Sequence, residues 1–380
     1  MLPQNNLHSD TRKRIDKMIR PEFRPFFTWL IGKPCFGETP QRKTVAEDLG
    51  STFFMLIFGL VVGYFAFTGD CVNLTAVPIS WVYVLSSTRK LRLTIQHACS
   101  HNAVFSHRFW NKALGEFISI LTLTLPFREY QKNHTKVHHS HHLLTPGDET
   151  YNFLFLNAGF RPGMKVDEAW KHLIKTAFSP TFHCRQLYSR IKSAFCSPYP
   201  THNLISLAFW LSILCGVGIT HSWQMFFWIW VLPLSAFFEV SSLLRQCVEH
   251  KFGNSPQEMT SAIFCGEEPP VFNHSDSIWV KVLGVTRWWM RMFFYHLPVR
   301  LLILTGDSPV HDYHHKRPGN DWVNAHIDRQ AEVETGISYT HSWGLLEAID
   351  KTFDSLSTIS PDYSATGKLE VKNQRNSSCC

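Results

Sequence analysis

The sequence lacks the short motifs with which a chain carries its own electron-transfer cofactor. It has no CxxCH for haem attachment, no ferredoxin-type run of cysteines and no GxGxxG for a dinucleotide. Its ten cysteines form no CxxC and no framework spacing, which excludes a small disulfide-stapled domain and favours reduced thiols in a cytosol-facing protein. Any electrons that this chain uses must therefore come from a separate protein.

The N-terminus lacks the apolar run of a signal peptide and is polar instead. Basic side chains are crowded over residues 12–24, which is typical of an arm that stays in the cytoplasm and touches anionic lipid heads. No recognised nucleic-acid fold or RNA motif accompanies this arm, so we expect no nucleic-acid partner. The net charge of +7 is modest, and its placement is more informative than its size.

Four apolar stretches, arranged in two pairs, predict two transmembrane hairpins. They are Phe53–Gly69, Leu74–Ser87, Leu204–Ile219 and Trp223–Leu244. The turns near residues 70 and 220 carry no Lys or Arg, whereas the long polar segments carry many, so we expect both termini and the polar segments in the cytoplasm. Ile278–Leu304 is interrupted by four basic residues and predicts helices that lie at the membrane surface. The predicted fold is an all-α membrane protein with four transmembrane helices and a cytosolic helical cap.

Clusters of histidines beside these stretches are the most informative feature of the chain. His97 and His101 are spaced HxxxH, the third cluster is HxxHH over residues 311–315, and His250 stands between the second and third clusters. Residues four apart lie about 40° from each other around a helix and share a face. A zinc site uses three or four ligands, whereas these clusters suit two metal ions, and imidazole suits iron, copper, zinc and nickel alike.

The second cluster, HTKVHHSHH, has two interpretations. One is HxxxHH, formed by His134, His138 and His139. The other is HxxHH, formed by His138, His141 and His142. Either triplet places its imidazoles on one side of a helix, so the residues alone leave both interpretations open.

The clusters and their surroundings resemble the histidine boxes of the membrane fatty acid desaturase family over roughly residues 50 to 325. HACSHNAVFSHRFWNKALGE resembles the first box, with Phe105, Asn111 and Gly115 in the expected places. HHSHHLLT resembles the second box, and HDYHHKRP resembles the third. Arg245 and His250 resemble the extra histidine region after the fourth span. Ala98 departs from the family pattern, which usually has an acidic residue there.

The resemblance implies four spanning helices beneath a cytosolic cap, a centre of two Fe ions, and O₂-dependent attack on an unactivated C–H bond. The implied metal ligands are His97, His101, His138, His141, His142, His250, His311, His314 and His315. The residues expected beside the metals rather than on them are His134, His139, Asp148, Glu149, Glu249, Asp312 and Asp321. Such carboxylates accept the free ring N–H of a ligating imidazole and fix its orientation.

The implied function is desaturation of a fatty acyl chain, which requires an enclosed apolar tunnel. A hydroxylase of the same architecture, acting on a polar or carrier-tethered metabolite such as an amino acid, would have a short charged pocket. A metal transporter would need charged residues within the spans. Phe53–Gly69 and Leu204–Ile219 contain none, and Trp223–Leu244 contains only Glu239. The expected partners are an external ferredoxin or cytochrome-type electron donor, the lipid bilayer, and an acyl or small-molecule substrate.

We divide the chain into three predicted parts on these grounds. Residues 1–50 form a polar basic arm, and residues 51–357 form the desaturase-like catalytic domain. Residues 358–380 are rich in polar residues and are expected to form a mobile tail.

Overall fold

A computed structural model describes residues 11–68, 72–140, 143–253 and 256–360, and the protein is mostly helical. Its α-helices are α1 (Thr11–Asp16), α2 (Arg24–Ile31), α3 (Val45–Phe67), α4 (Ala76–Lys90), α5 (Gln96–Ser100), α6 (Arg108–Thr122), α7 (Phe127–Asn133), α8 (Glu149–Tyr151), α9 (Val166–Ala177), α10 (Pro180–Phe195), α11 (Pro200–Ile219), α12 (Trp223–Phe226), α13 (Phe238–Glu249), α14 (Pro256–Met259), α15 (Ile278–Arg291), α16 (Leu297–Leu302), α17 (His311–Lys316), α18 (Ala325–Glu334) and α19 (Leu345–Thr358).

Shorter elements interrupt or connect these helices. The 3-10 segments are η2 (Pro21–Phe23), η9 (Ser308–Val310) and η10 (Trp322–Asn324). The π-helical turns are η3 (Leu91–Ile95), η4 (His134–His138), η5 (Asn152–Asn157), η6 (Phe227–Val231), η7 (Pro233–Phe237) and η8 (Met292–His296). Two strands, β1 (Ala262–Phe264) and β2 (His341–Trp343), pair in parallel and are a small departure from the all-α prediction.

Three helical segments of the described chain are long and apolar enough to cross a membrane. They are Val45–Phe67, Pro200–Ile219 and Trp223–Glu249, the last of which runs from α12 through α13. They correspond to three of the four predicted spans, and Gly69, the last residue of the first predicted span, lies outside the described residues. Helix α3 begins at Val45 because Thr44 and Glu47 form a capping box, in which each side chain accepts a hydrogen bond from the other residue's backbone N–H.

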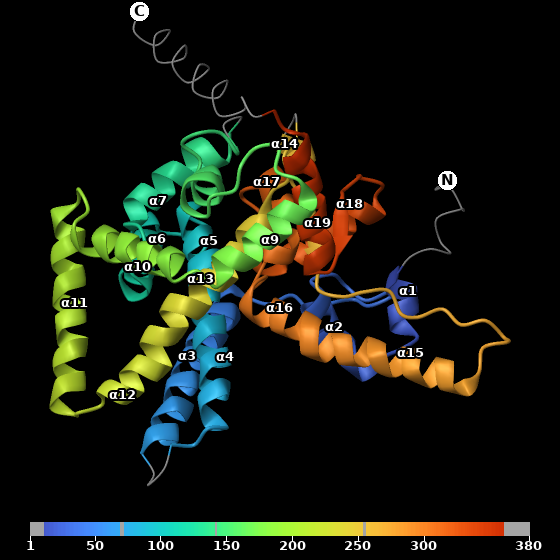
Figure 1. Ribbon diagram of the computed structural model, residues 1–380, viewed down its shortest axis with the longest axis horizontal. Coiled ribbons are helices and arrows are strands. Elements are labelled where there is room, and N and C mark those ends of the chain that lie inside the picture. The colour runs from blue at the N-terminus through green and yellow to red at the C-terminus, as the bar shows by residue number, and fades with distance from the viewer. Residues whose placement is uncertain (1–10, 69–71, 141–142, 254–255, 361–380) are drawn as a thin grey trace, which may run out of the picture.

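The remaining predicted span, Leu74–Ser87, forms most of α4, which packs along α3 but is too polar to meet the same criterion (Figure 1). Its polar groups are satisfied inside the protein. The Ser80 hydroxyl donates to the Gly59 carbonyl at 2.7 Å, and the buried Arg89 guanidinium donates to Ser242 Oγ at 2.6 Å and to the Leu302 carbonyl at 3.2 Å. Because neighbouring helices rather than lipid surround these groups, hydropathy underestimates how deeply α4 is buried. A fourth span remains a prediction.

The histidine-bearing helices gather at one end of the α3–α4 pair, opposite the end at which α3 finishes (Phe67) and α4 begins (Ala76) (Figure 1). A hydrophobic core joins α9, α13 and α19 there through Leu173, Leu243 and Phe353. Helix α15 lies across the direction of α3 in the same view and exposes Trp279 and Leu283 (78% and 71% of each residue). This arrangement fits the predicted helix at the membrane surface, while the side of the membrane remains a prediction.

Candidate metal centre

Nine buried or half-buried histidines converge in two neighbouring groups. The five-histidine group consists of His97, His101, His134, His139 and His314. The four-histidine group consists of His138, His250, His311 and His315. Within each group, one ring nitrogen from every residue lies within 4.8 Å of all the others. Each group therefore offers enough donors for one metal ion.

The two groups lie side by side because two short segments, residues 134–139 and 311–315, contribute histidines to both. The ring centroids of His139 and His315, which belong to different groups, are 4.5 Å apart. Those of His134 and His138 are 5.1 Å apart. The arrangement can therefore hold two metal ions as neighbours, which is the requirement of a dinuclear centre.

The local helices explain how the histidines reach these positions. Helix α7 continues into η4, so Tyr130, His134 and His138 follow one another at intervals of four residues and all face inward. Helix α4 likewise continues through the π turn η3 into α5, which carries His97. Such π-helical turns are frequent at functional sites because one extra residue changes the direction of the side chains that follow.

The loop after His101 is fixed by Asn111 and Gly115, two of the residues that supported the resemblance. The Asn111 side chain accepts from the backbone N–H groups of Val104 and Phe105 and donates to the Phe105 carbonyl at 2.7 Å. A Cβ atom at position 115 would lie 2.4 Å from the Phe127 ring. Only glycine lets α6 approach α7 this closely.

Seven of the nine histidines expected as ligands lie in the two groups, and the other two, His141 and His142, are outside the described residues. His134 and His139 were expected beside the metals, yet both belong to the five-histidine group. The helical continuation of α7 through residue 138 is the physical reason, because it turns His134 and His138 to the same side. The described geometry thus favours HxxxHH as the second box.

The ring nitrogens are spaced as ligands of a metal ion would be. Nε2 atoms are 3.1 Å apart between His101 and His134, 2.9 Å apart between His139 and His314, and 3.1 Å apart between His138 and His250. A metal–nitrogen bond of about 2.1 Å places neighbouring ligand atoms roughly 3 Å apart. His97 Nε2 is buried without a hydrogen-bond partner. The spacing of these nitrogen atoms is better explained by ligation of metal ions than by hydrogen bonds between the rings.

The charge state of the rings agrees with this fit. Burial, followed by repulsion from neighbouring rings, lowers the pKa of His101 to about 4 and lowers the pKa values of His97 and His314 well below the ordinary value. These imidazoles are neutral at pH 7, and neutral imidazole is the form that binds a metal.

Two carboxylates support the four-histidine group. Asp148 is fully buried and accepts a hydrogen bond from His138 Nδ1 at 2.9 Å, so His138 Nε2 is left facing the group. Burial opposes a charged His138, but Asp148 outweighs it and raises the pKa of that ring. Glu249 Oε1 lies 3.1 Å from His311 Nε2, and the same carboxylate binds the Arg245 guanidinium through both oxygens at 2.6 Å.

The other carboxylates expected beside the metals have different surroundings. Asp312 is buried against Arg329, with the shortest contact at 2.7 Å, and so joins α17 to α18. Asp321 binds the Arg42 guanidinium at 3.0 Å and accepts from the Asn324 side chain at 2.7 Å, rather than from an imidazole. Burial raises the pKa of Glu149, and Arg92 and His138 oppose that shift.

Residues 72–322, well over half of the chain, match the family model described as fatty acid desaturase. The chain belongs to the fatty acid desaturase family. No curated protein and no solved structure matches the chain. Membership makes the protein an oxidoreductase, and together with the three apolar helices it indicates an integral membrane protein.

This desaturase-family protein contains a cavity of about 790 Å³ beside the histidines. Segments 21–43, 48–55, 86–94, 300–310 and 322–326 line it. Asp307 and Trp322 also line a small recess against His97, His101 and His314, so they connect the cavity to the five-histidine group. Asp307 was not among the residues predicted from the sequence, and no local pattern marks it, because it precedes a 3-10 segment rather than sharing a helix with His311.

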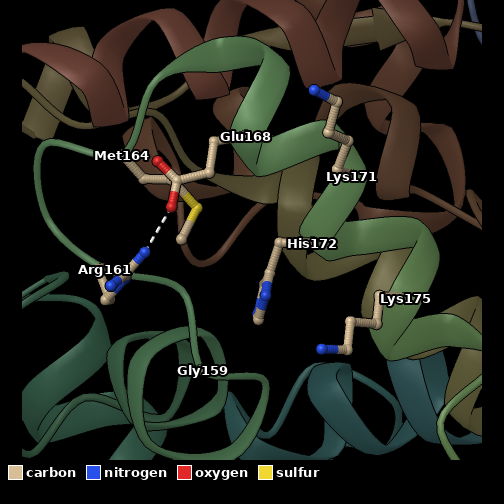
Figure 2. A pocket seen from close by; sticks show the side chains of 7 residues that line it. All are labelled: Gly159, Arg161, Met164, Glu168, Lys171, His172 and Lys175. Carbon is tan, nitrogen blue, oxygen red and sulfur yellow. Dashed lines mark hydrogen bonds and ion pairs between the residues drawn. The ribbon is translucent and has the colours of Figure 1, made fainter.

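A different hollow, of about 360 Å³, lies on the outer side of α9 (Figure 2). Arg161, Lys171, His172 and Lys175 line it, and Arg161 pairs with Glu168 across it. None of its lining residues belongs to either histidine group. It is a basic surface feature of the desaturase-family chain, separate from the candidate metal centre.

Proposed function

We propose that the protein is an O₂-dependent di-iron oxidoreductase that removes hydrogen from an aliphatic chain, and that its reaction is desaturation of a fatty acyl substrate. The convergence of nine histidines in two adjoining groups, within a chain of the fatty acid desaturase family, carries this proposal. In it, the five-histidine group and the four-histidine group each hold one iron ion. When bound, the iron pair supplies the O₂ activation needed to break an unactivated C–H bond.

Three features of the chain's own residues support this role. Asp148 fixes the ring of His138 so that Nε2 faces the group, and Arg245 holds the Glu249 carboxylate next to His311. The rigid positions reduce the reorganisation needed when a metal binds. The cavity beside Asp307 provides a place for the substrate next to the five-histidine group.

Hydroxylation of a polar substrate is the second candidate, and the cavity wall favours it. An acyl chain requires an apolar tunnel, but the aromatic residues lining this cavity, apart from His326, are Trp29 and Trp322. Its charged lining residues include Lys90, Arg300 and Asp307. A wall of this kind suits a substrate with a polar part better than a bare hydrocarbon chain.

Transport of a metal ion is disfavoured by the environment of Glu239. This carboxylate, the one acidic residue noted within the predicted spans, is buried and binds the Arg190 guanidinium at 2.9 Å. Its charge is therefore neutralised within the protein, and no further acidic partner contacts it in the described structure.

An external electron donor is part of the proposal because the chain has no redox cofactor motif of its own. We place its docking site on the outer side of the α7–η4 helix. Lys132 and Lys136 are exposed there, two residues away from the inward-facing His134 and His138. An acidic carrier docked on these lysines would be about one helix diameter, 10–12 Å, from both histidine groups.

Product analysis tests the proposed function. The full-length protein is purified, loaded with iron and supplied with O₂, a reductase system and candidate acyl substrates. Loss of two hydrogen atoms from the product establishes desaturation, and gain of one oxygen atom establishes hydroxylation. Retained turnover after iron has been removed and not replaced would contradict both reactions.

A further inference from the structure

Two residues that line the cavity beside the five-histidine group have buried oxygen atoms that lack hydrogen-bond partners. Thr305 is 3% exposed and lines the cavity, and its Oγ1 atom has no partner. Asp48 lines the same cavity; its Oδ1 atom accepts from Lys90 Nζ at 2.6 Å, but its Oδ2 atom is buried without a partner. A buried oxygen atom that loses water without gaining another partner destabilises the protein. These atoms are therefore expected to bind whatever fills the cavity.

The loop that carries Thr305 is held in place, so the backbone position of Thr305 beside the cavity is fixed. Gly306 has a φ of +58°, and a Cβ atom there would lie 2.1 Å from Thr94 Oγ1. Arg300 donates to the carbonyls of Leu304 and Gly306 on either side of Thr305. Gly306 therefore lets the loop pack closely against η3, and the buried Arg300 guanidinium binds the loop to α16.

The two cations of the inner wall, Lys90 and Arg300, already have partners. Lys90 binds Asp48, and Arg300 donates to three backbone carbonyls, including that of Trp29 at 2.7 Å. Lys43 lines the cavity but is exposed at its outer edge. The inner wall thus offers the Thr305 hydroxyl and the Asp48 carboxylate oxygen rather than free cations. The negative charge of Asp48 favours a donor group over a carboxylate on the ligand.

We propose that the cavity binds an aliphatic substrate carrying a hydrogen-bond donor, a hydroxyl or an amine, with this group on Thr305 or Asp48 and a nearby methylene facing the histidines past Asp307. This inference rests on the proposed function, whose substrate class it specifies. A site built to bond such a group discriminates against chains that lack it, because its own oxygen atoms would then remain unpaired.

Equilibrium binding to the full-length protein in detergent tests the inference without requiring turnover. Dodecanol, dodecylamine, dodecanoate and dodecane are matched in chain length, and their binding is followed by competition with a fluorescent long-chain probe. We expect dodecanol or dodecylamine to bind at least about tenfold more tightly than dodecane and dodecanoate. Equal affinity for dodecane, or tighter binding of dodecanoate, would overturn the proposal.

Thr305→Val removes the hydroxyl at nearly constant volume and should weaken binding of the preferred donor about three- to tenfold. Ser308→Ala is the matched control, because Ser308 is also buried with an unpartnered hydroxyl but does not line the cavity. An equal effect of both substitutions, or no effect of Thr305→Val and Asp48→Asn, refutes the assignment. If Thr305→Val does not fold, Thr305→Ser, which keeps the hydroxyl, must retain the preference while Thr305→Ala loses it.

The two proposals can fail separately. A protein that prefers dodecanol but oxidises no candidate chain supports the binding site and contradicts the proposed function. A protein that oxidises bare chains and donor-bearing chains equally well retains the proposed function and contradicts the inference made here.

Discussion

The two histidine groups offer the same type of donor atom but are supported in different ways. The four-histidine group has Asp148 behind His138 and Glu249 against His311. Across the described ranges, the rings of the five-histidine group make no hydrogen bond to a carboxylate. Carboxylates behind imidazole ligands fix the rings and make them better donors. The four-histidine group is therefore the better anchored of the two, and the five-histidine group is the one that meets the cavity.

This difference suggests a division of roles. The more strongly held metal ion suits the position farther from the substrate. The other position, held by imidazole alone, has fewer fixed charges around it and suits the side that faces the substrate. Asp307 and Trp322 connect the cavity to His97, His101 and His314, which all belong to the five-histidine group. We therefore expect the substrate to approach the five-histidine group first.

The largest effect is expected from loss of one histidine in either group. His314→Ala and His138→Ala should both reduce turnover to background and lower the iron content, because each removes a donor from a group whose members lie within 4.8 Å of one another. Iron measured per protein and product formation are the two readouts. His183→Ala is a suitable control, since His183 belongs to neither histidine group and its Nε2 donates to the Ala177 carbonyl at 2.8 Å. Full activity with unchanged iron in either test variant would contradict the metal assignment.

The next comparison decides between the two interpretations of the second box. His134→Ala and His139→Ala should lower iron content and abolish turnover, because both rings lie in the five-histidine group. His141→Ala and His142→Ala should have much smaller effects if HxxxHH is the metal-binding triplet. The reverse pattern would restore HxxHH, formed by His138, His141 and His142, as the second box.

The second box shows where prediction of the metal ligands from the sequence reaches its limit. Spacings of three and four residues both place side chains on one face of a helix, so HTKVHHSHH supports two triplets equally well. The deciding fact is tertiary: α7 packs with Tyr130 inward and continues through η4, which fixes the direction of His134 and His138. The first and third boxes were predictable because each had a single possible set of histidines.

The membrane spans and the cavity also differ in how well the sequence predicts them. Three spans were predictable because each is a long apolar run. In α4, Arg89 and Ser80 are hydrogen-bonded to neighbouring helices, so its hydropathy is too low for the same criterion. The cavity is assembled from five segments distributed over about 300 residues, and no local pattern marks Thr305 or Asp307 as its lining. Convergence of distant segments is set by packing and cannot be derived from spacing alone.

Removing the carboxylate behind His138 should have an intermediate effect and should make the two groups more alike. Asp148→Asn keeps the side-chain shape but removes the charge that stabilises the His138 ring, so metal affinity should fall about 10- to 100-fold. Iron retained during titration with a chelator is the measurement. In the unmodified protein we expect one iron to leave before the other, and in Asp148→Asn we expect the two to leave together.

Asp321→Asn provides the control for that experiment, because Asp321 binds Arg42 and Asn324 rather than an imidazole. It should leave the order of iron loss unchanged. Simultaneous loss of both irons from the unmodified protein would mean that the carboxylates do not distinguish the two groups.

The smallest effect is expected at the docking site that we propose for the electron donor on the α7–η4 helix. Replacing Lys132 and Lys136 together by Glu should raise the KM for an acidic donor about three- to tenfold, more at low salt than at high salt, because exposed charges are screened. Reduction of both irons should slow equally, since η4 carries His134 of one group and His138 of the other. Turnover driven by dithionite should be unchanged.

The basic hollow on α9 supplies the matched comparison for this last test. Replacing Lys171 and Lys175 together by Glu makes the same change of charge at a surface that carries no histidine of either group (Figure 2). If the donor docks on the α7–η4 helix, this second variant keeps the KM of the unmodified protein. A larger increase in KM for the α9 variant would move the docking site to the hollow. The donor would then reach the four-histidine group first, because α9 packs against α13, which ends next to His250.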